Sequence, residues 1–595
     1  MADSSAAVTS RLSRLNPFSR SKPEVDDEDI GEEVDSATVA GGGHSARQSD
    51  ITKNQLRVSR ALRRFLIDNR MLSEDDARVD NNDQLTPRVR ALLEEPHIHV
   101  PAELTDRSHP LPDYFISSSH NTYLLAHQLY GSSSASAYES TLLAGARCVE
   151  IDAWDNDENE NEPKVTHGYT LVSNISFRAV CETIRDVVDK EATESTDAQG
   201  YRAAPILLSL ENHCGPQGQM RLVQIMKEVW GDRLLDEAVR QKGHEEQQGL
   251  GGHVRLSDLG SKIAVIVEYH HPDEKLDSDD TESSSSDSDD ENETPEEKEA
   301  RKQYKQNKQN EIASKIIPEL ADLGVYAQSV KPSDNSWYDK DELTNTPHHP
   351  LINLSESGLG SHMPTHSDKI ARNNAKHLMR VYPKGTRISS RNLKPVPFWG
   401  VGAQICALNW QTFGASMQIN EALFSDTDGY VLKPGPLRAG GTGVLSSRKR
   451  RVTLHVGGAT DIPVPEDREP SEVKPYITCT LVHPDDLADT PPKRKTSAYR
   501  QHKLTGFLNR HNENPPVTDP LWDEKLHWDY RDNDLTFLRI LLKSDDAFAR
   551  NPIFAVTAVR LTYVVPGQWR FIRLLDLKGR ETKCALLVKF DFEDL

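Results

Sequence analysis

The sequence predicts an α/β protein with a TIM-like (β/α)8 barrel that is split by an acidic linker. A short helical region precedes the barrel, and an antiparallel β-sandwich follows it. The barrel is predicted because strand-like and helix-like segments alternate from residue 112 to about 440, and polar residues follow several strand candidates. From about residue 450, short alternating segments between Pro, Gly and Asp turns predict the sandwich.

The N-terminal part of the chain divides into a tail and a helical region. Residues 1–50 are rich in Ser, Gly, Asp and Glu, so we expect a disordered tail. Residues 51–111 are expected to be helical, because apolar side chains recur every three or four positions from Leu56 to Leu66. The acidic stretch 80–83 lacks the glycine and the spaced oxygen ligands of an EF-hand loop, so we expect no working EF-hand there.

The barrel strands are predicted where apolar runs lie between turn signals and helical patterns. The eight candidates are residues 113–118, 148–153, 163–167, 205–211, 262–268, 377–382, 404–409 and 429–433. They fall into two halves, 112–270 and 316–440, separated by a linker over 271–315. Within the linker, residues 277–299 contribute −11 to a formal net charge of −21, and blocks of like charge are typical of disorder.

Composition excludes several classes of function. No run approaches the ~18 apolar residues of a membrane-spanning helix, and the N-terminus has no apolar stretch of signal-peptide type. The six cysteines are scattered without a CxxC motif, which is typical of reduced cytosolic thiols. Outside the acidic segment the chain still carries −10, which favours no nucleic-acid partner. We therefore expect a cytoplasmic protein.

Polar residues that can carry chemistry stand at the ends of the first four strand candidates. They are His120, Asn121, Glu150, Asp152, His167 and Glu211. Alternation along a strand puts Glu150 and Asp152 on one face. Three carboxylates and an amide carbonyl suit a hard cation such as Ca²⁺, and the absence of a Cys/His cluster argues against zinc as their metal. Each histidine alone is more often structural, but together with the carboxylates the pair indicates calcium-assisted cleavage of a phosphodiester.

Several motifs resemble the eukaryotic phosphoinositide-specific phospholipases C, in the order found in that family. Residues 112–269 resemble the X region, and residues 351–438 resemble the Y region. The motifs of the Y region are Ser355-Glu-Ser357, Arg380-Val-Tyr-Pro383, and the segments 404–412 and 429–434. Residues 448–595 resemble a C2 domain, and 51–111 would be an EF-hand remnant. The layout, without a PH domain, is similar to short fungal and plant members. The resemblance also supports the strand count in the second half of the barrel.

The resemblance implies calcium-dependent hydrolysis of phosphoinositides in lipid signalling. The substrate would be phosphatidylinositol 4,5-bisphosphate or a less phosphorylated form. The products would be diacylglycerol and inositol phosphates, formed through a cyclic inositol phosphate. The residues that match the calcium ligands of the family are Asn121, Glu150, Asp152 and Glu211. His120, His167 and Glu150 match its catalytic residues, with Asp152 as the alternative base.

Recognition of the lipid headgroup is where the sequence departs from the family. Asn353, Arg380 and Tyr382 match headgroup-binding positions, but Ile266 and Glu268 replace two lysines that hold ring phosphates in the family. We therefore expect a reduced preference for the bisphosphate. The alternative is a shift of one or two residues in the alignment, with Lys262 or a neighbouring helix supplying the charge.

The resemblance also implies partners. We expect a monomer that contacts membrane phosphoinositides peripherally, and residues 277–299 would either restrain activity or be a passive insertion. The C2-like region has few spaced aspartates, which favours a structural module over a calcium-binding one. Two other functions stay open. A catalytically dead lipid-binding scaffold is disfavoured because none of the site residues is lost. A glycerophosphodiester phosphodiesterase-like barrel is disfavoured by the split layout and the C2-like tail.

Overall fold

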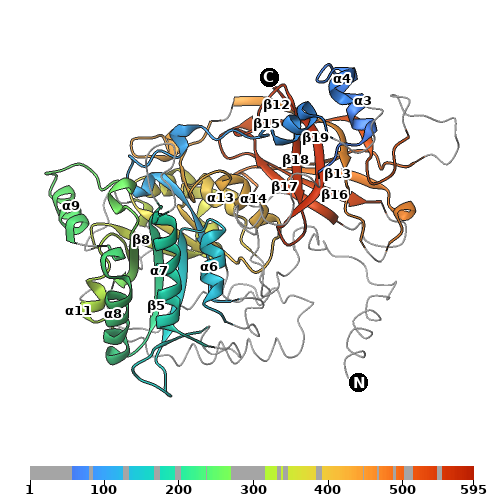
Figure 1. Cartoon of the computed structure of the whole chain (residues 1–595). Coiled ribbons are helices and arrows are strands. Elements are labelled where there is room, and N and C mark those ends of the chain that lie inside the picture. The colour runs from blue at the N-terminus through green and yellow to red at the C-terminus, as the bar shows by residue number, and fades with distance from the viewer. Residues whose placement is uncertain are drawn as a thin grey trace, which may run out of the picture.

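Eight parallel strands close into a barrel, which lies beside an antiparallel β region (Figure 1). The computed structural model describes residues 56–78, 85–124, 133–166, 174–193, 203–235, 237–269, 315–330, 337–339, 346–383, 392–446, 448–465, 468–486, 491–501, 514–545 and 553–595. The predicted tail, the acidic segment 277–299 and the acidic stretch 80–83 lie outside these residues. In the described part of the chain, no helix combines the length and apolarity needed to cross a bilayer.

The barrel confirms the predicted fold class. Its strands are β1 (Tyr114–Ser119), β2 (Cys148–Trp154), β5 (Ile206–His213), β6 (Ile263–Tyr269), β7 (Gln328–Val330), β8 (Pro350–Ser355), β9 (Leu378–Tyr382) and β10 (Ile405–Leu408). The order around the barrel is β1-β10-β9-β8-β7-β6-β5-β2, and pairing of Ser118 with Cys148 closes β2 onto β1. All eight neighbouring pairs are parallel, so every strand carries its carboxyl end to the same mouth.

Two of the eight predicted strands were wrong as barrel members. Segment 163–167 contains β3 (Lys164–Val165), which pairs antiparallel with β2 and with β4 (Ile175–Ser176). Segment 429–433 contains β11 (Tyr430–Leu432), which pairs antiparallel with β1. The strands β7 and β8 take their places. An apolar run does not reveal the direction of its partner, and the three residues of β7 are too few to show a period.

Alternation along each strand divides the barrel into two apolar layers. Every second residue along a strand points into the barrel. Cys148, for example, joins an apolar core inside the barrel with Ile116, Leu207 and Ile266. Its neighbour Val149 packs outward against the surrounding helices. These helices are α6 (Ser136–Leu143), α7 (Phe177–Thr193), α8 (Pro216–Trp230), α9 (Glu237–Gln247), α11 (Pro318–Ala321), α12 (Glu356–Asn374), α13 (Pro395–Gly400) and α14 (Ala415–Phe424). Two residues beyond Cys148 and Ile266, nearer the mouth, the same face carries the charged residues Glu150 and Glu268.

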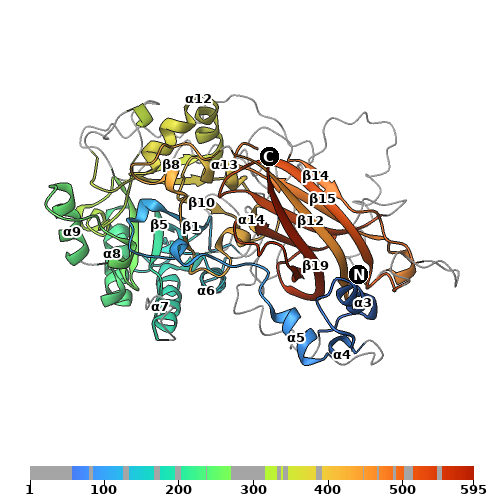
Figure 2. The same ribbon diagram turned by 90° about the horizontal axis from the view of Figure 1, so that it is seen from above.

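The C-terminal region is an eight-stranded antiparallel sheet that encloses its own core (Figure 2). Its strands are β12 (Arg448–Thr460), β13 (Pro475–Val482), β14 (Lys493–Lys495), β15 (Leu521–Asp532), β16 (Phe537–Ser544), β17 (Ile553–Arg560), β18 (Trp569–Leu575) and β19 (Glu581–Asp594), in the order β14-β13-β16-β17-β18-β19-β12-β15. Phe537 and Val556 of this sheet share a buried cluster with the barrel helices, and Arg539 Nε donates to Gln418 Oε1 of α14 at 2.7 Å. The two regions therefore share an apolar interface.

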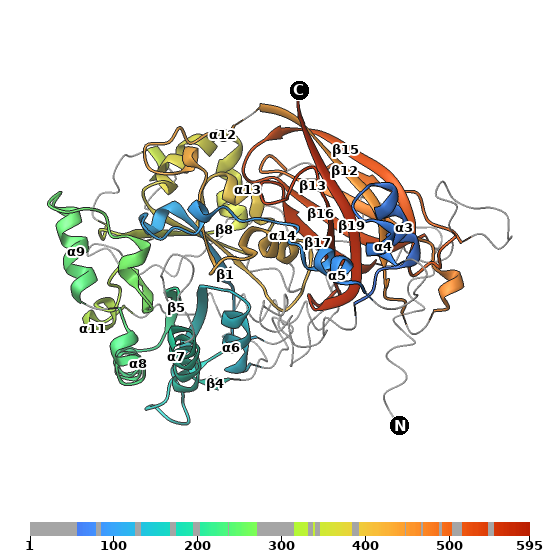
Figure 3. The ribbon, with the colours of Figure 1, turned by 45° about the horizontal axis from the view of Figure 1, so that its top comes forward.

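The N-terminal helices pack on the C-terminal sheet (Figure 3). They are α3 (Arg60–Asp68), α4 (Glu74–Ala77) and α5 (Pro87–Glu94), and side chains of Ser59, Ser73 and Thr86 cap their amino ends. Phe65 meets Trp569 edge-on with ring centroids 5.0 Å apart. Arg570 pairs with Glu95 at 2.8 Å. The helical region thus completes the apolar core on one side of the sheet.

Candidate active site

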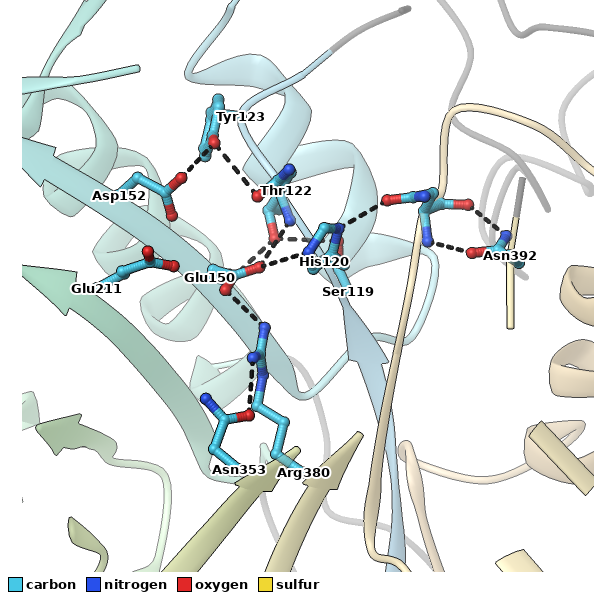
Figure 4. A network of polar contacts seen from close by, with 12 residues as sticks. Ser119, His120, Thr122, Tyr123, Glu150, Asp152, Glu211, Asn353, Arg380 and Asn392 are labelled. Atoms are coloured by element: carbon cyan, nitrogen blue, oxygen red, sulfur yellow. Dashed lines mark hydrogen bonds and ion pairs between the residues drawn. The ribbon is translucent and has the colours of Figure 1, made fainter. Parts of the chain in front are cut away.

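The mouth of the barrel gathers most of the predicted site residues (Figure 4). His120 and Asn121 follow β1, Glu150 and Asp152 lie on β2, and Glu211 lies on β5. Asn353 on β8 and Arg380 on β9 reach the same place from the opposite half of the barrel. His167 lies outside the described residues, so its position stays a prediction.

Three carboxylates form the centre of the site. The register of β2 and β5 sets Asp152 beside Glu211, and one oxygen each of Glu150, Asp152 and Glu211 lies within 4.8 Å of the others. Glu150 and Asp152 are buried, whereas the Glu211 side chain is 48% exposed. Burial, together with the charges of Glu211 and Glu150, raises the pKa of Asp152 well above its usual value. Asp152 Oδ1 is buried and accepts no hydrogen bond. These residues therefore fit a divalent cation. Such an ion would offset the repulsion between the carboxylates and would give Asp152 Oδ1 a partner.

The turn after β1 brings backbone and amide groups to the carboxylates. Asn121 has φ +46°, in the left-handed region that asparagine tolerates better than most residues. This conformation lets its N–H donate to Glu150 Oε2 at 2.8 Å. The Tyr123 hydroxyl lies 2.6 Å from Asp152 Oδ2 and 3.2 Å from Asn121 Oδ1. Burial raises the pKa of Tyr123, so the hydroxyl keeps its proton and donates it over the shorter contact.

A buried ion pair connects the carboxylates to the predicted headgroup residues. Arg380 Nη2 donates to Glu150 Oε1 at 2.6 Å, and Nη1 donates to Asn353 Oδ1 at 3.1 Å. Both charged side chains are only 4% exposed. The Arg380 guanidinium carbon lies 5.4 Å from the centroid of the Tyr382 ring. Removing one member of a buried ion pair leaves the other charge buried without a partner. Arg380 therefore also stabilises Glu150 in its buried position.

His120 is held by Asn409, which is held in turn by Asn392. Its Nδ1 lies 2.8 Å from Asn409 Oδ1, and Asn392 Oδ1 in turn accepts from the Asn409 backbone N–H at 2.6 Å. An amide oxygen can only accept, so Nδ1 carries the proton and Nε2, 4.0 Å from Glu150 Oε2, faces the site. Burial lowers the pKa of His120, against the opposing charge of Glu150. The ring is therefore mainly neutral before an anion enters.

Sequence reasoning missed the roles of Tyr123, Asn392 and Asn409. Asn409 lies inside the segment 404–412 that carries the resemblance, and Tyr123 lies two residues after Asn121. Both were therefore close to recognised positions, but only the folded chain shows which atoms they contact. Asn392 precedes α13 and had no signal in the sequence, because its contact with Asn409 joins two separate loops.

The β6 strand shows where the two positions that replace lysines lie. Ile266 is buried in the core inside the barrel, and Glu268 follows on the same face toward the mouth. Lys262 directly precedes β6, on the opposite end of the barrel. At ~3.3 Å per residue it lies roughly 13 Å along the strand from Ile266. Lys262 therefore does not supply a charge at the mouth.

Comparisons with known proteins match both halves of the barrel. Residues 107–269 match the family described as phosphatidylinositol-specific phospholipase C, X domain, and residues 320–436 match its Y domain. The chain belongs to this family. The match to both domains disfavours a glycerophosphodiester phosphodiesterase-like barrel.

Several curated phosphodiesterases are relatives of this phospholipase C family member. It is 30% identical over 529 residues to a 1-phosphatidylinositol 4,5-bisphosphate phosphodiesterase of Dictyostelium discoideum, which covers 83% of this chain and 60% of that protein. It is 31% identical over 520 residues to the delta-1 enzyme of the same name from Homo sapiens, covering 82% and 61%. The chain thus spans about three-fifths of the length of these relatives.

Solved structures show the same fold. The crystal structure of S. officinalis PLC21 matches with a TM-score of 0.64 at 24% identity, covering 86% of this chain and 60% of that one. The crystal structure of L. pealei PLC21 also gives a TM-score of 0.64, at 22% identity, covering 94% and 65%. The arrangement of barrel and antiparallel region is therefore shared with these proteins.

Proposed function

We propose that this chain is a calcium-dependent phosphoinositide phospholipase C, a phosphoric diester hydrolase. The observation that carries the proposal is the packing of Glu150, Asp152 and Glu211 beside His120 at the mouth of an X/Y-type barrel. The relatives are named for hydrolysis of a phosphoinositide. No predicted site residue in the described part of the chain lies away from the mouth, which disfavours a dead scaffold.

The donor set supports calcium as the metal. Asn121, Glu150, Asp152 and Glu211 offer only oxygen atoms, and Ca²⁺ prefers six to eight oxygen ligands with water and substrate completing the shell. Bound calcium would lower the pKa of the inositol 2-hydroxyl and neutralise charge on the phosphate. Imidazole nitrogens are absent from this donor set, so zinc is not favoured here.

The residues can divide the reaction between them. Glu150, or Asp152 as the alternative, takes the proton of the inositol 2-hydroxyl, whose oxygen attacks the neighbouring phosphorus. The bond from phosphorus to the glycerol oxygen breaks, which gives a cyclic inositol phosphate. His167 protonates the departing oxygen of diacylglycerol and then activates the water that opens the cycle.

His120 stabilises the negative charge that develops on the phosphate. Because Asn409 fixes the proton on Nδ1, Nε2 is the nitrogen that faces a substrate phosphate. The anionic phosphate favours protonation of the ring, and the imidazolium then donates through Nε2 to the charged oxygens of the transition state. Asn409 is thus a positioning residue for His120.

An assay on mixed vesicles tests the proposed function. We expect calcium-dependent release of water-soluble inositol phosphates together with diacylglycerol. A scaffold would bind the vesicles and release neither product. A glycerophosphodiester phosphodiesterase would cleave deacylated glycerophosphoinositol and leave the intact lipid unchanged. Either outcome would overturn the proposal.

Headgroup preference gives a separate prediction. Glu268 repels ring phosphates, and a charge-assisted hydrogen bond contributes ~1.5–3 kcal/mol, so Glu268→Lys should raise the ratio of bisphosphate to phosphatidylinositol hydrolysis at least about tenfold. Glu268→Gln is the matched control, which removes repulsion without adding attraction, and it should give a smaller rise. Rates on the three lipids measure the ratio. A strong bisphosphate preference in the unaltered chain would refute the role given to Ile266 and Glu268.

The acidic segment 277–299 gives a prediction for membrane engagement. We propose that the chain is a cytoplasmic monomer that touches membranes peripherally, and that this segment opposes binding to an anionic surface by charge repulsion. Deleting it should raise hydrolysis of anionic vesicles, and the gain should shrink at high salt. The control replaces its acidic residues with Asn and Gln at the same length. Unchanged rates in both variants would identify a passive insertion.

The C-terminal sheet is proposed to be a C2 domain that acts as a structural module. Asp461 Oδ1 accepts a hydrogen bond from Arg57 Nε at 2.6 Å, and Asp519 Oδ2 accepts one from Arg57 Nη2 at 2.8 Å. The Arg57 guanidinium therefore already offsets part of the negative charge of these two aspartates, which disfavours a calcium ion beside them. Arg57 leads into α3, so this ion pair also anchors the N-terminal helices to the sheet.

A further inference from the structure

A second cluster of metal-ligand side chains lies at the opposite end of the barrel. His348 and His349 directly precede β8, and Glu246 stands in the last turn of α9. These positions belong to the amino ends of the barrel strands, whereas the active site lies at the carboxyl ends (α9 and β8 in Figure 1). Residues at this end of such barrels serve stability rather than catalysis.

The three side chains aim at one point. Glu246 Oε2 lies 3.4 Å from His348 Nε2 and 3.5 Å from His349 Nε2, and the three atoms lie within 4.8 Å of one another. Both nitrogens are buried and have no hydrogen-bond partner. Buried ring nitrogens that converge on a carboxylate without a hydrogen bond are atypical of a structural contact.

The surroundings hold the histidines in this arrangement. The Tyr326 ring stacks on His349 with centroids 4.1 Å apart and planes 13° apart. Gly243 of α9 faces both rings, since a Cβ there would make ordinary van der Waals contact with His349 Nε2 at 3.4 Å and His348 Cδ2 at 4.0 Å.

The carboxylate is oriented by groups behind it. His253 Nδ1 lies 2.6 Å from Glu246 Oε1, and the Val254 N–H donates to Oε2 at 3.2 Å. A histidine that binds the far oxygen of a metal-ligating carboxylate is a common outer partner in metal sites.

We propose that Glu246, His348 and His349 form a structural site for a borderline divalent transition metal, zinc above all. A tetrahedral zinc ion with bonds of ~2.0–2.1 Å keeps its ligand atoms roughly 3.3–3.4 Å apart, close to the spacings from Glu246 to the two histidines. Water would fill the fourth position. Calcium does not suit two imidazoles, so this site and the carboxylates at the mouth select different metals.

The site joins the two halves of the barrel. Glu246 precedes the segment 270–314 in the chain, and His348 and His349 follow it. A bound ion therefore cross-links the X and Y halves at the end remote from the substrate. The expected consequence is greater resistance of the barrel to unfolding, with no requirement for zinc in hydrolysis.

Zinc titration of the untagged, metal-depleted full chain tests the site. We expect one equivalent of Zn²⁺ bound in calorimetry, a tetrahedral Co²⁺ absorption spectrum, and a higher thermal midpoint with Zn²⁺. The double variant His348→Asn/His349→Asn should bind zinc about 10–100-fold more weakly. Glu246→Gln should show the same loss. Because it keeps the volume of the side chain, it tests the site even if the double variant unfolds. Two controls should bind zinc normally: His244→Asn, on the exposed face of α9, and Asp152→Asn, at the mouth.

Two results would overturn the site. One is failure of the unaltered chain to bind a stoichiometric zinc ion. The other is unchanged binding in folded Glu246→Gln or His348→Asn/His349→Asn protein. Loss of zinc in Asp152→Asn would instead assign the ion to the carboxylates at the mouth, which also contradicts the proposal. Because these readouts do not use lipid hydrolysis, they are independent of the proposed function.

Discussion

His120→Ala is expected to reduce phosphoinositide hydrolysis by about 10²–10³-fold, the usual loss when one donor to a developing oxyanion is removed. The ring is held by Asn409, and its Nε2 lies 4.0 Å from Glu150 Oε2 at the centre of the site. The loss should fall on kcat, because the donated hydrogen bond strengthens in the transition state. Steady-state rates on mixed vesicles measure it.

The control for this variant is His244→Ala, an exposed histidine at the other end of the barrel. It should keep normal turnover, and circular dichroism should show both variants folded. Near-normal kcat in folded His120→Ala protein would remove His120 from the mechanism. His167→Ala should cause a comparable loss, and this variant tests the proposed acid that lies outside the described residues.

Asp152→Asn should separate activity from stability. The Asp152 carboxylate is buried among two other carboxylates, and its unpaired Oδ1 has no compensating contact. The neutral amide of the variant removes the repulsion with the other two carboxylates. In the presence of a chelator, the variant should therefore unfold at the same temperature as the unaltered chain or at a higher one. Hydrolysis should nevertheless need at least about tenfold more calcium for half-maximal rate, because a charged oxygen ligand is lost.

Calcium titrations of activity and thermal unfolding in chelator provide the two measurements. Tyr123→Phe is the matched control: it removes only the hydrogen bond to Asp152 Oδ2 and should shift the calcium requirement less. An unchanged calcium requirement in Asp152→Asn protein would show that this carboxylate is no metal ligand. Strong destabilisation without calcium would contradict the electrostatic account of the cluster.

The sequence predicted the parts of the site that depend on local pattern. Strand alternation placed Glu150 and Asp152 on one face, and the β2–β5 register then brought Glu211 beside them as expected. Local pattern does not reveal contacts between distant strands. The ion pair of Arg380 with Glu150 joins residues 230 positions apart, and it gives a predicted headgroup residue a second task.

The same limit explains the errors in the strand assignment and the missed metal cluster. The apolar pattern of segments 163–167 and 429–433 does not distinguish them from the barrel strands β7 and β8. Only their antiparallel pairing shows that they are not barrel strands. His348 and His349 are adjacent in sequence, but without Glu246 they show no ligand spacing. The fold of the barrel supplies that carboxylate from a helix a hundred positions earlier.

The most direct test of the account follows the phosphorus of the substrate by ³¹P NMR in phosphatidylinositol vesicles. With calcium, we expect the diester signal to decay into that of a cyclic inositol phosphate and then that of an acyclic one, with one diacylglycerol released per headgroup. Chelator should stop the reaction and fresh calcium should restart it. Binding of the vesicles with an unchanged diester signal, or cleavage that continues in chelator, would contradict it.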